Sequence, residues 1–320
     1  MDFLINTMFS FEDILICPKT GEILSVEGNS LVASSGRAYP IVEGIPVLID
    51  DSQSLFKQAD FIEGRKTFFS NNPIKRALMQ LIPELGVNFS CKQNLRKVAE
   101  KISHLPKPRI LTVGGSIVGQ GASDFLNTPN YEVIDTDVTF GPRTKVICDG
   151  HSLPFQDNSV DVVLVQAVLE HVLDPVKVVQ EIHRVLKPEG IVYSEIPFMQ
   201  QVHGKAFDFT RYSYLGQRRL FRNFEAMEMG PTAGPGSSLS WSYVYFLMGF
   251  SNNFYVRTGL RLFGTYTSFW LKYLDYLTKN KASALDGASG IYFLGTKSDH
   301  TLDDGELIKQ YKGGFRSYFA

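Results

Sequence analysis

The chain has 320 residues, of which 44% are hydrophobic and 20% are charged. This composition is typical of globular proteins, and the length leaves room for about two domains of roughly 150 residues each. The formal net charge of −1 shows no basic excess, so we expect no nucleic acid partner. The three cysteines (Cys17, Cys91 and Cys148) are too far apart for a metal-binding pair or a disulfide framework, which favours a cytosolic protein.

The first residues contain Asp2, Glu12 and Asp13 and lack the basic start and unbroken apolar run of a secretory signal. We therefore expect no export. Residues 239–277 are the most apolar later region, but charged residues such as Arg257 interrupt them before the roughly 20 apolar residues that a membrane-spanning helix needs.

Residues 1–50 contain short apolar runs separated by turn compositions such as PKTGE and SSGR, which predicts a small β module. Residues 51–108 change to helical spacing, and we interpret them as a helical connector. Residues 109–300 form the main predicted domain, with a helical insert at about 212–285 and a late strand GIYFLGTK. Residues 301–320 are read as a C-terminal tail.

Strands and helices alternate in the main domain, which indicates a parallel sheet covered by helices. The predicted strands are residues 110–113, 131–134, 145–148, 160–165 and 191–195. The clearest helix follows Asp174 and Pro175, an N-cap and a first-turn proline, and the KPEG sequence at 187–190 ends it. The fold class predicted from this order is a doubly wound α/β sheet.

The first strand runs into the glycine-rich loop VGGSIVGQG. Gly114, Ser116 and Gly119 nearly reproduce the dinucleotide spacing G-x-G-x-x-G, whereas Gly119 and Gly121 fit a looser loop. Asp135 and Asp137 follow about 20 residues later, and Asp137, at the end of the second strand, suits the two ribose hydroxyls of a nucleoside ligand. These features fit NAD and S-adenosylmethionine equally well as the cofactor.

The stretch CDGHSLPFQDNSVDVVLVQAVLEHV, followed by HRVLKPEGIVYSEIP, resembles the class I S-adenosylmethionine-dependent methyltransferases, in particular the small-molecule branch with the quinone-biosynthesis enzymes. The resemblance implies a Rossmann-like methyltransferase sheet. It also implies a set of cofactor-binding residues: Gly114, Gly115, Gly119 and Gly121 around the methionine part and ribose, Asp137 on the ribose, Asp149 near the adenine amine, and Gln166 facing cofactor or substrate. The family usually has an acidic residue where Thr112 stands, so we expect a wider loop around the same ligand.

NAD-dependent nucleotide-sugar enzymes are the competing enzyme interpretation. They typically pair a tyrosine with a lysine four residues later, which lowers the pKa of the tyrosine. None of the fourteen tyrosines of this chain has a lysine at that spacing, which weighs against this class.

The N-terminal module, with AYPIVEGIPVLI at its end, resembles the zinc-ribbon family of tRNA-methyltransferase activator proteins. A structural zinc site needs about four nitrogen or sulfur ligands. Only Cys17 remains here, with Thr20 in place of its partner and Ser34 or Ser35 at the second pair. We therefore expect no metal and interpret the module as a remnant that packs on the main domain or binds a partner.

The segment IPFMQQVHGKAFDFTRYS lies where the resembled family commonly builds its substrate pocket. Its predicted catalytic residues are His203, as a base for a hydroxyl acceptor, and Asp208 with Arg211, which could hold a phosphate or carboxylate. The alternative is an internal Asp208–Arg211 ion pair and a surface histidine. His171, in the LEHV motif, is interpreted as structural.

Aromatic and basic residues alternate across residues 242–281, which is compatible with a helix on an anionic membrane or with a buried lid. The sequence thus predicts a methyltransferase that uses S-adenosylmethionine. The expected reaction is O-methylation of a small molecule, a sugar or a lipid-linked sugar, in polysaccharide biosynthesis. Peripheral contact with a membrane is one interpretation of the aromatic and basic segment. A non-catalytic partner protein with a degenerate cofactor loop is the alternative from another class.

Overall fold

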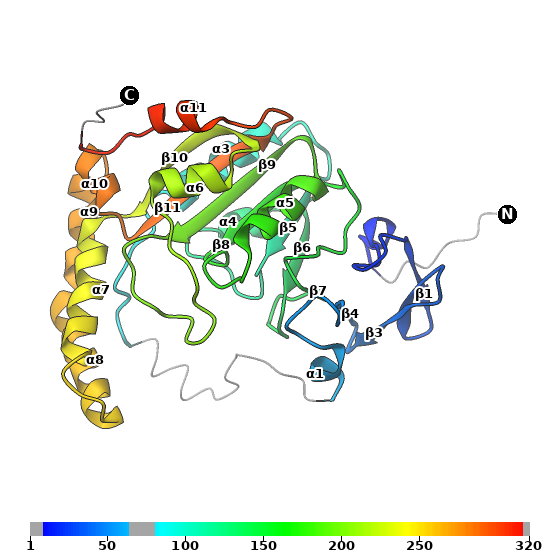
Figure 1. The fold of residues 1–320 in the computed structure, drawn as a ribbon, viewed down its shortest axis with the longest axis horizontal. Coiled ribbons are helices and arrows are strands. Elements are labelled where there is room, and N and C mark those ends of the chain that lie inside the picture. Colours follow the sequence, from blue (N-terminus) through cyan, green and yellow to red (C-terminus); the bar gives the residue numbers. More distant parts are fainter. Residues whose placement is uncertain (1–8, 64–80, 316–320) are drawn as a thin grey trace.

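The computed structural model describes residues 9–63 and 81–315. Within these ranges eleven strands join in one sheet in the order β1-β2-β3-β4-β7-β6-β5-β8-β9-β11-β10 (Figure 1). The strands are β1 (Leu24–Glu27), β2 (Ser30–Ala33), β3 (Ala38–Val42), β4 (Ile45–Leu48), β5 (Arg109–Val113), β6 (Glu132–Asp137), β7 (Val146–Cys148), β8 (Val160–Gln166), β9 (Leu186–Pro197), β10 (Phe224–Ala233) and β11 (Gly290–Lys297).

The strands from β7 to β9 run parallel, and β11 lies antiparallel beside β9. This arrangement confirms the predicted doubly wound α/β class. All five strands predicted from the sequence exist, with β9 longer than expected because it begins directly after the preceding helix.

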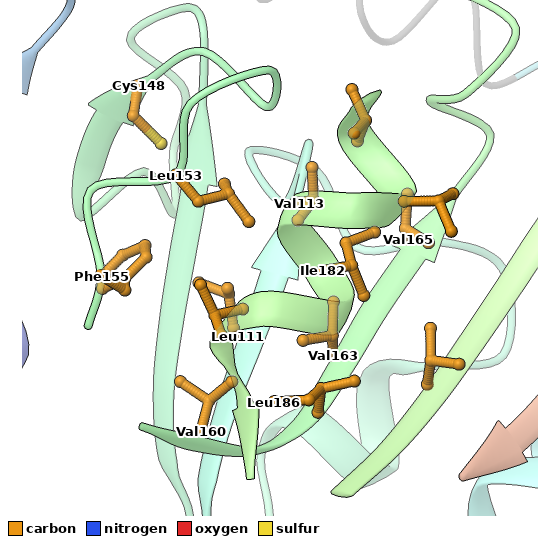
Figure 2. Packing of buried hydrophobic residues seen from close by; sticks show 14 of the residues in the cluster. Leu111, Val113, Cys148, Leu153, Phe155, Val160, Val163, Val165, Ile182 and Leu186 are labelled. Carbon is orange, nitrogen blue, oxygen red and sulfur yellow. The ribbon is translucent and has the colours of Figure 1, made fainter. Parts of the chain in front are cut away.

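Helices cover both faces of the sheet, and alternate residues of each strand point to opposite sides. On one face Leu111 and Val163 pack with Ile182 of α5 (Pro175–Val185), as Figure 2 shows. On the other face Ile110 and Val162 pack with α3 (Cys91–Lys101). Burial on both faces explains why the strands read as continuous apolar runs.

Helix α5 begins as the sequence predicts. The side chain of Asp174 accepts a hydrogen bond of 3.1 Å from the backbone N–H of Lys177, and Pro175 occupies the first turn. The KPEG sequence at 187–190 does not form a turn outside the sheet. It forms a bulge at the start of β9, because Leu186 pairs with Val160 and the next pair joins Ile191 to Val162.

The N-terminal strands β1 to β4 form an antiparallel meander whose last strand joins the main sheet. Val47 of β4 lies beside Ile147 of β7 in a parallel pair. The short helix η1 (Glu12–Ile14) and Leu15, which bridges to Phe155, also contact the main domain. The module therefore packs directly on the main domain.

Among its described residues the predicted connector (51–108) is helical in part. It contains α1 (Gln58–Ile62) and α3, and residues 64–80, which hold most of the predicted helical pattern, lie outside the described residues. Residues 81–90 form no helix, which corrects the sequence interpretation there. Pro83 disfavours a helical conformation for the residue before it, and the backbone N–H of Phe89 donates to the carbonyl of Thr232.

The insert contains a strand that the sequence analysis missed. Strand β10 begins within the predicted helical segment and lies antiparallel to β11. Its sequence FEAMEMGPTA has no clear alternation, so only the pairing with β11 defines it. The helices of this part are α6 (Tyr214–Leu220), α7 (Pro235–Met248), α8 (Phe254–Ser268), η2 (Phe269–Leu274), α9 (Asp275–Thr278) and α10 (Ala282–Asp286).

Helices α7 and α8 form a long pair at one side of the sheet (Figure 1). The remaining helices are α4 (Ser123–Leu126), which follows the glycine loop, and α11 (Asp304–Lys309), near the C-terminus. Among the described helices none has the length and apolar character needed to cross a membrane.

Candidate functional site

The first cavity, of about 710 Å³, opens at the carboxyl ends of the parallel strands. Val113 and Gly114 border it from β5, Asp137 from β6, Asp149 after β7 and Ala167 after β8. Doubly wound sheets bind their ligands at this edge, because the strand ends leave a crevice between the loops that follow them. The cavity combines apolar walls with three carboxylates, those of Asp137, Asp149 and Asp174.

Asp137 lies at the end of β6 with its side chain turned to the glycine loop. The backbone N–H of Ser116 donates to Oδ2 of Asp137 at 3.3 Å. Burial raises the pKa of Asp137, and the hydrogen bonds from Ser116 oppose that rise only in part. Its position at the cavity wall fits a carboxylate that accepts from vicinal ribose hydroxyls.

Asp149 has partners from two distant segments. Oδ2 accepts from Ser54 Oγ at 2.5 Å, and Oδ1 accepts from the backbone N–H of His151 at 3.0 Å. Burial pushes the pKa of Asp149 upward, but the hydrogen bonds from His151 and Ser54 outweigh burial and keep the pKa below its ordinary value. A carboxylate has about four acceptor sites, so Asp149 retains capacity for an adenine amine.

The first two glycines of the loop are required by close packing. Gly114 has φ +72°, and a Cβ there would lie 2.4 Å from the side chain of Val168. A Cβ at Gly115 would lie 1.8 Å from Oγ1 of Thr112, which donates to Oδ1 of Asp135 at 2.7 Å. Thr112 thus serves the interior of the sheet rather than the cavity.

Four predicted cofactor residues are absent from the wall of the first cavity, namely Gly115, Gly119, Gly121 and Gln166. Gly119 and Gln166 line a second cavity, and Gly121, with φ +91°, packs against Cys91 of α3. The wider loop expected from the sequence therefore extends toward the neighbouring cavity. The roles of all seven predicted residues toward a cofactor stay predictions.

The second cavity, of about 660 Å³, lies between the sheet and helix α7. Gln166 and Glu195 line it from β8 and β9, and Trp241 and Tyr245 line it from α7. Ala167 and His203 border both cavities. The two cavities therefore share Ala167 and His203 as parts of their walls, and we call this place their junction.

Glu195 is a half-buried residue of the second cavity that the sequence analysis did not identify. Its carboxylate accepts hydrogen bonds from Tyr193 at 2.5 Å, Asn88 at 2.8 Å and Gln166 at 3.0 Å. Burial raises the pKa of Glu195 despite these donors. The sequence contained a signal for Glu195, because it is an acidic residue near the end of a predicted central strand.

The predicted catalytic residues share one loop, but only His203 reaches a cavity. Arg211 forms a two-contact ion pair with Asp208, at 2.5 and 3.0 Å. Asp208 also accepts from the backbone N–H groups of His203 and Gly204. Asp208 and Arg211 are absent from both cavity walls. Their hydrogen bonds instead fix the loop that carries His203.

Two further groups lie beside His203. Glu170 is fully buried, and neither of its carboxylate oxygens has a hydrogen-bond partner among the described residues. Its Oε1 lies 3.6 Å from Nε2 of His171 and 3.7 Å from Nε2 of His203. The sequence analysis treated His171 as structural and did not consider Glu170, although both belong to the LEHV motif.

One carboxylate joins the positions at which the resembled zinc-ribbon family would have metal ligands. Glu22 accepts hydrogen bonds from Thr20 at 2.7 Å, Ser34 at 2.6 Å and Ser35 at 2.5 Å. These bonds lower the pKa of Glu22 to about 2. Cys17 borders this network, because its backbone N–H donates to the carbonyl of Glu22 at 2.8 Å, and its Sγ contacts the hydroxyl of Tyr39 at 3.2 Å.

The fold and the site together define a class: a Rossmann-like α/β domain with a nucleoside-type cavity at its strand ends. Residues 123–194 match the family model described as methyltransferase domain. The chain therefore contains a class I methyltransferase domain, whose cofactor is S-adenosylmethionine. The first cavity fits this cofactor, since it offers carboxylates for ribose and adenine beside apolar walls.

Curated relatives match different amounts of the chain. An uncharacterised 37.1 kDa protein in a transposon of Streptomyces fradiae is 26% identical over 179 residues, which are 55% of this chain and 46% of that protein. A UPF0434 protein of Vesicomyosocius okutanii is 43% identical over 49 residues, which are 15% of this chain and 83% of that protein. Over those 49 residues the chain belongs to the UPF0434 family.

Among solved structures, phosphoethanolamine N-methyltransferase 2 of Haemonchus contortus, in complex with S-adenosylmethionine, is similar. Its identity is 16%, its TM-score is 0.44, and the match covers 82% of this chain and 62% of that one.

Proposed function

We propose that this protein transfers the methyl group of S-adenosylmethionine to a hydroxyl oxygen of an acceptor in the second cavity. The observation that carries the proposal is the junction of the two cavities at His203 and Ala167. A cofactor in the first cavity can direct its methyl group into the second only if the two communicate.

S-adenosylmethionine supplies an electrophilic methyl group on a sulfonium. The acceptor oxygen forms the new bond to this carbon, the carbon–sulfur bond breaks with its electron pair left on sulfur, and the hydroxyl proton leaves. The products are the methyl ether, S-adenosylhomocysteine and one proton. Such a reaction depends mainly on holding the reactants in line and away from water.

Two groups of the second cavity are suited to receive the proton. His203 is the base that the sequence predicts, and Glu195 is a carboxylate whose pKa is raised by burial. Asp208 and Arg211 act indirectly in this proposal, by fixing the loop that carries His203.

Aromatic rings from two segments border the first cavity, in which we place the cofactor. Phe56 of the connector stacks on Phe207 of the His203 loop, with ring centres 6.2 Å apart, and both line the first cavity. Exclusion of water on this side would protect the sulfonium and strengthen its interaction with the acceptor oxygen.

The lining of the second cavity and the helices beside it support a lipid-linked sugar as the acceptor. Tyr245 and Met248 of α7 and Arg261 of α8 line the second cavity. The connection between these helices and the start of α8 expose large apolar side chains, including Phe250, at 71%, and Phe254, at 73%. Exposed aromatic residues with neighbouring basic groups are typical of helices that lie on an anionic membrane.

The N-terminal module is proposed to be a metal-free remnant of a ribbon fold. Glu22 supports this proposal, because its hydrogen bonds join the positions where the resembled family has metal ligands. In this proposal the module packs on the main domain in place of a separate activator.

The decisive experiment is calorimetric titration with S-adenosylmethionine, followed by incubation with labelled cofactor and a panel of lipid-linked and free sugars. Binding with label transfer to an alkali-stable ether on one acceptor is the expected result. Absence of both heat and thermal stabilisation by the cofactor would favour the alternative of a non-catalytic partner protein.

A further inference from the structure

The junction of the two cavities contains three side chains with metal-binding atoms. Glu170, His171 and His203 each offer one such atom, and these atoms lie within 4.8 Å of one another. Glu170 lines the second cavity, His171 the first, and His203 both. We propose that these three residues bind a divalent transition-metal ion at the point where the cavities meet.

The tautomers of both histidines favour this site. Nδ1 of His171 lies 2.5 Å from the carbonyl oxygen of Phe207, and Nδ1 of His203 lies 3.2 Å from that of Gln201. Because a carbonyl only accepts hydrogen bonds, each Nδ1 carries the proton. In the neutral ring the lone pair is then on Nε2, and such backbone contacts are the usual way in which metal-binding histidines are oriented.

The carboxylate supplies the second, independent observation. Glu170 is 0% exposed, and neither oxygen has a hydrogen-bond partner among the described residues. A buried carboxylate is costly unless it is paired, and the polar atoms that face Glu170 are the two Nε2 atoms at 3.6 and 3.7 Å. Glu170 raises the pKa of His203, so without a metal a proton on Nε2 balances the carboxylate. A cation shared by the three atoms can take the place of that proton.

The distances suit a small cation. Ligands of tetrahedral zinc at bonds of about 2.1 Å are about 3.4 Å apart. The two separations of Glu170 from the histidines, 3.6 and 3.7 Å, need only a slight contraction, and the third pair of atoms lies within 4.8 Å. Two imidazoles with one carboxylate select zinc, iron or cobalt over magnesium or calcium, which prefer oxygen ligands. Three protein ligands leave a coordination position open to the cavities, as in catalytic metal sites.

The surrounding loop is built closely around the histidines. A Cβ at Gly204 would lie 2.5 Å from the ring of His171, so only glycine permits this approach. Asp208 accepts from the backbone N–H groups of His203 and Gly204 and thereby fixes both residues. The rings of His171 and His203 are 5.0 Å apart at nearly right angles.

The role of the metal rests on the proposed function, whereas metal binding itself does not. A metal at the junction would hold the acceptor oxygen toward the methyl group and lower the pKa of its hydroxyl. The proton would pass to Glu195 or to water, while His203 would be a ligand and no longer a free base. This departs from the expectation of no metal, which rested on the N-terminal module.

The test uses the full chain after removal of metals with a chelator and titration with Co²⁺, followed by its visible absorption, and with Zn²⁺ by calorimetry. We expect one ion per chain with a tetrahedral or five-coordinate cobalt spectrum. Glu170→Gln and His203→Ala should each weaken binding by more than about 10-fold, while cofactor binding persists.

The matched control is His300→Ala. Its ring also lies near a carboxylate, 3.8 Å from Glu306, but both groups are exposed. Unchanged metal binding in this variant together with loss in Glu170→Gln supports the site. No binding to the wild-type chain, or equal binding to wild type and Glu170→Gln, overturns it. Loss of cofactor binding in the wild type would instead count against the proposed methyl transfer alone.

Discussion

The backbone N–H of Ser116 in the glycine loop donates to Oδ2 of Asp137 at the end of β6, at 3.3 Å. This contact joins the loop to the predicted ribose carboxylate. Asp137→Ala is therefore expected to weaken binding of S-adenosylmethionine by about 1.5–3 kcal/mol, the range for hydrogen bonds to a charged group. Isothermal titration calorimetry measures the change. Asp124→Ala, at an exposed residue of α4, is the control, and equal affinity in both variants would remove Asp137 from the site.

Gly115 packs on Thr112, and its replacement should disturb the sheet. A Cβ at this position would lie 1.8 Å from Oγ1 of Thr112, so Gly115→Ala is expected to lower the free energy of unfolding by about 1–3 kcal/mol. Gly259→Ala in α8 meets nothing within 4 Å and should raise it by about 0.5–1 kcal/mol. Chemical denaturation gives both values, and destabilisation of similar size in the two variants would contradict the packing argument.

His203→Ala is expected to lower turnover by about 10²–10⁴-fold while the affinity for S-adenosylmethionine stays nearly constant. The reason is its position at the junction of the cavities, where it acts on the acceptor side. Single-turnover rates and cofactor titration separate the two quantities. A variant with full turnover would show that the acceptor needs no group at His203.

The Glu22 network predicts a dependence of stability on pH. Hydrogen bonds from Ser34, Ser35 and Thr20 lower the pKa of Glu22 from 4.5 to about 2 in the folded chain. Its contribution is thus complete above pH 4.5 and is lost as the pH falls toward 2. The difference in melting temperature between wild type and Glu22→Gln should shrink across this interval. A difference that stays constant from pH 6 to pH 2 would mean that the network does not act through the ionised carboxylate.

The exposed aromatic side chains of the α7–α8 pair predict membrane binding. The double variant Phe250→Ser/Phe254→Ser should bind vesicles of anionic lipid about 10-fold more weakly, because two largely exposed rings no longer enter the interface. Co-sedimentation measures the change. Ile23→Ser, which removes an exposed apolar residue of the N-terminal module, should bind like the wild type. If the wild type binds no vesicle, membrane contact is contradicted, and the acceptor is then expected to be a soluble molecule.

Local sequence determined the positions of the central strands and the start of α5. Continuous apolar runs such as VDVVLV require burial on both faces, and Asp174 with Pro175 defines a helix N-terminus without help from distant residues. The position of Asp137 followed as well, because a carboxylate at a strand end must lie at the edge of a parallel sheet.

Tertiary structure decided which residues meet at the site. Glu170 and His203 are 33 positions apart along the sequence, and only the loop fixed by Asp208 and Arg211 brings their side chains together. Strand β10 likewise exists through its pairing with β11, since its own sequence carries no strong strand pattern. Periodicity and capping are local properties, whereas a buried carboxylate facing two imidazoles depends on contacts between distant segments, and no spacing in the sequence encodes these.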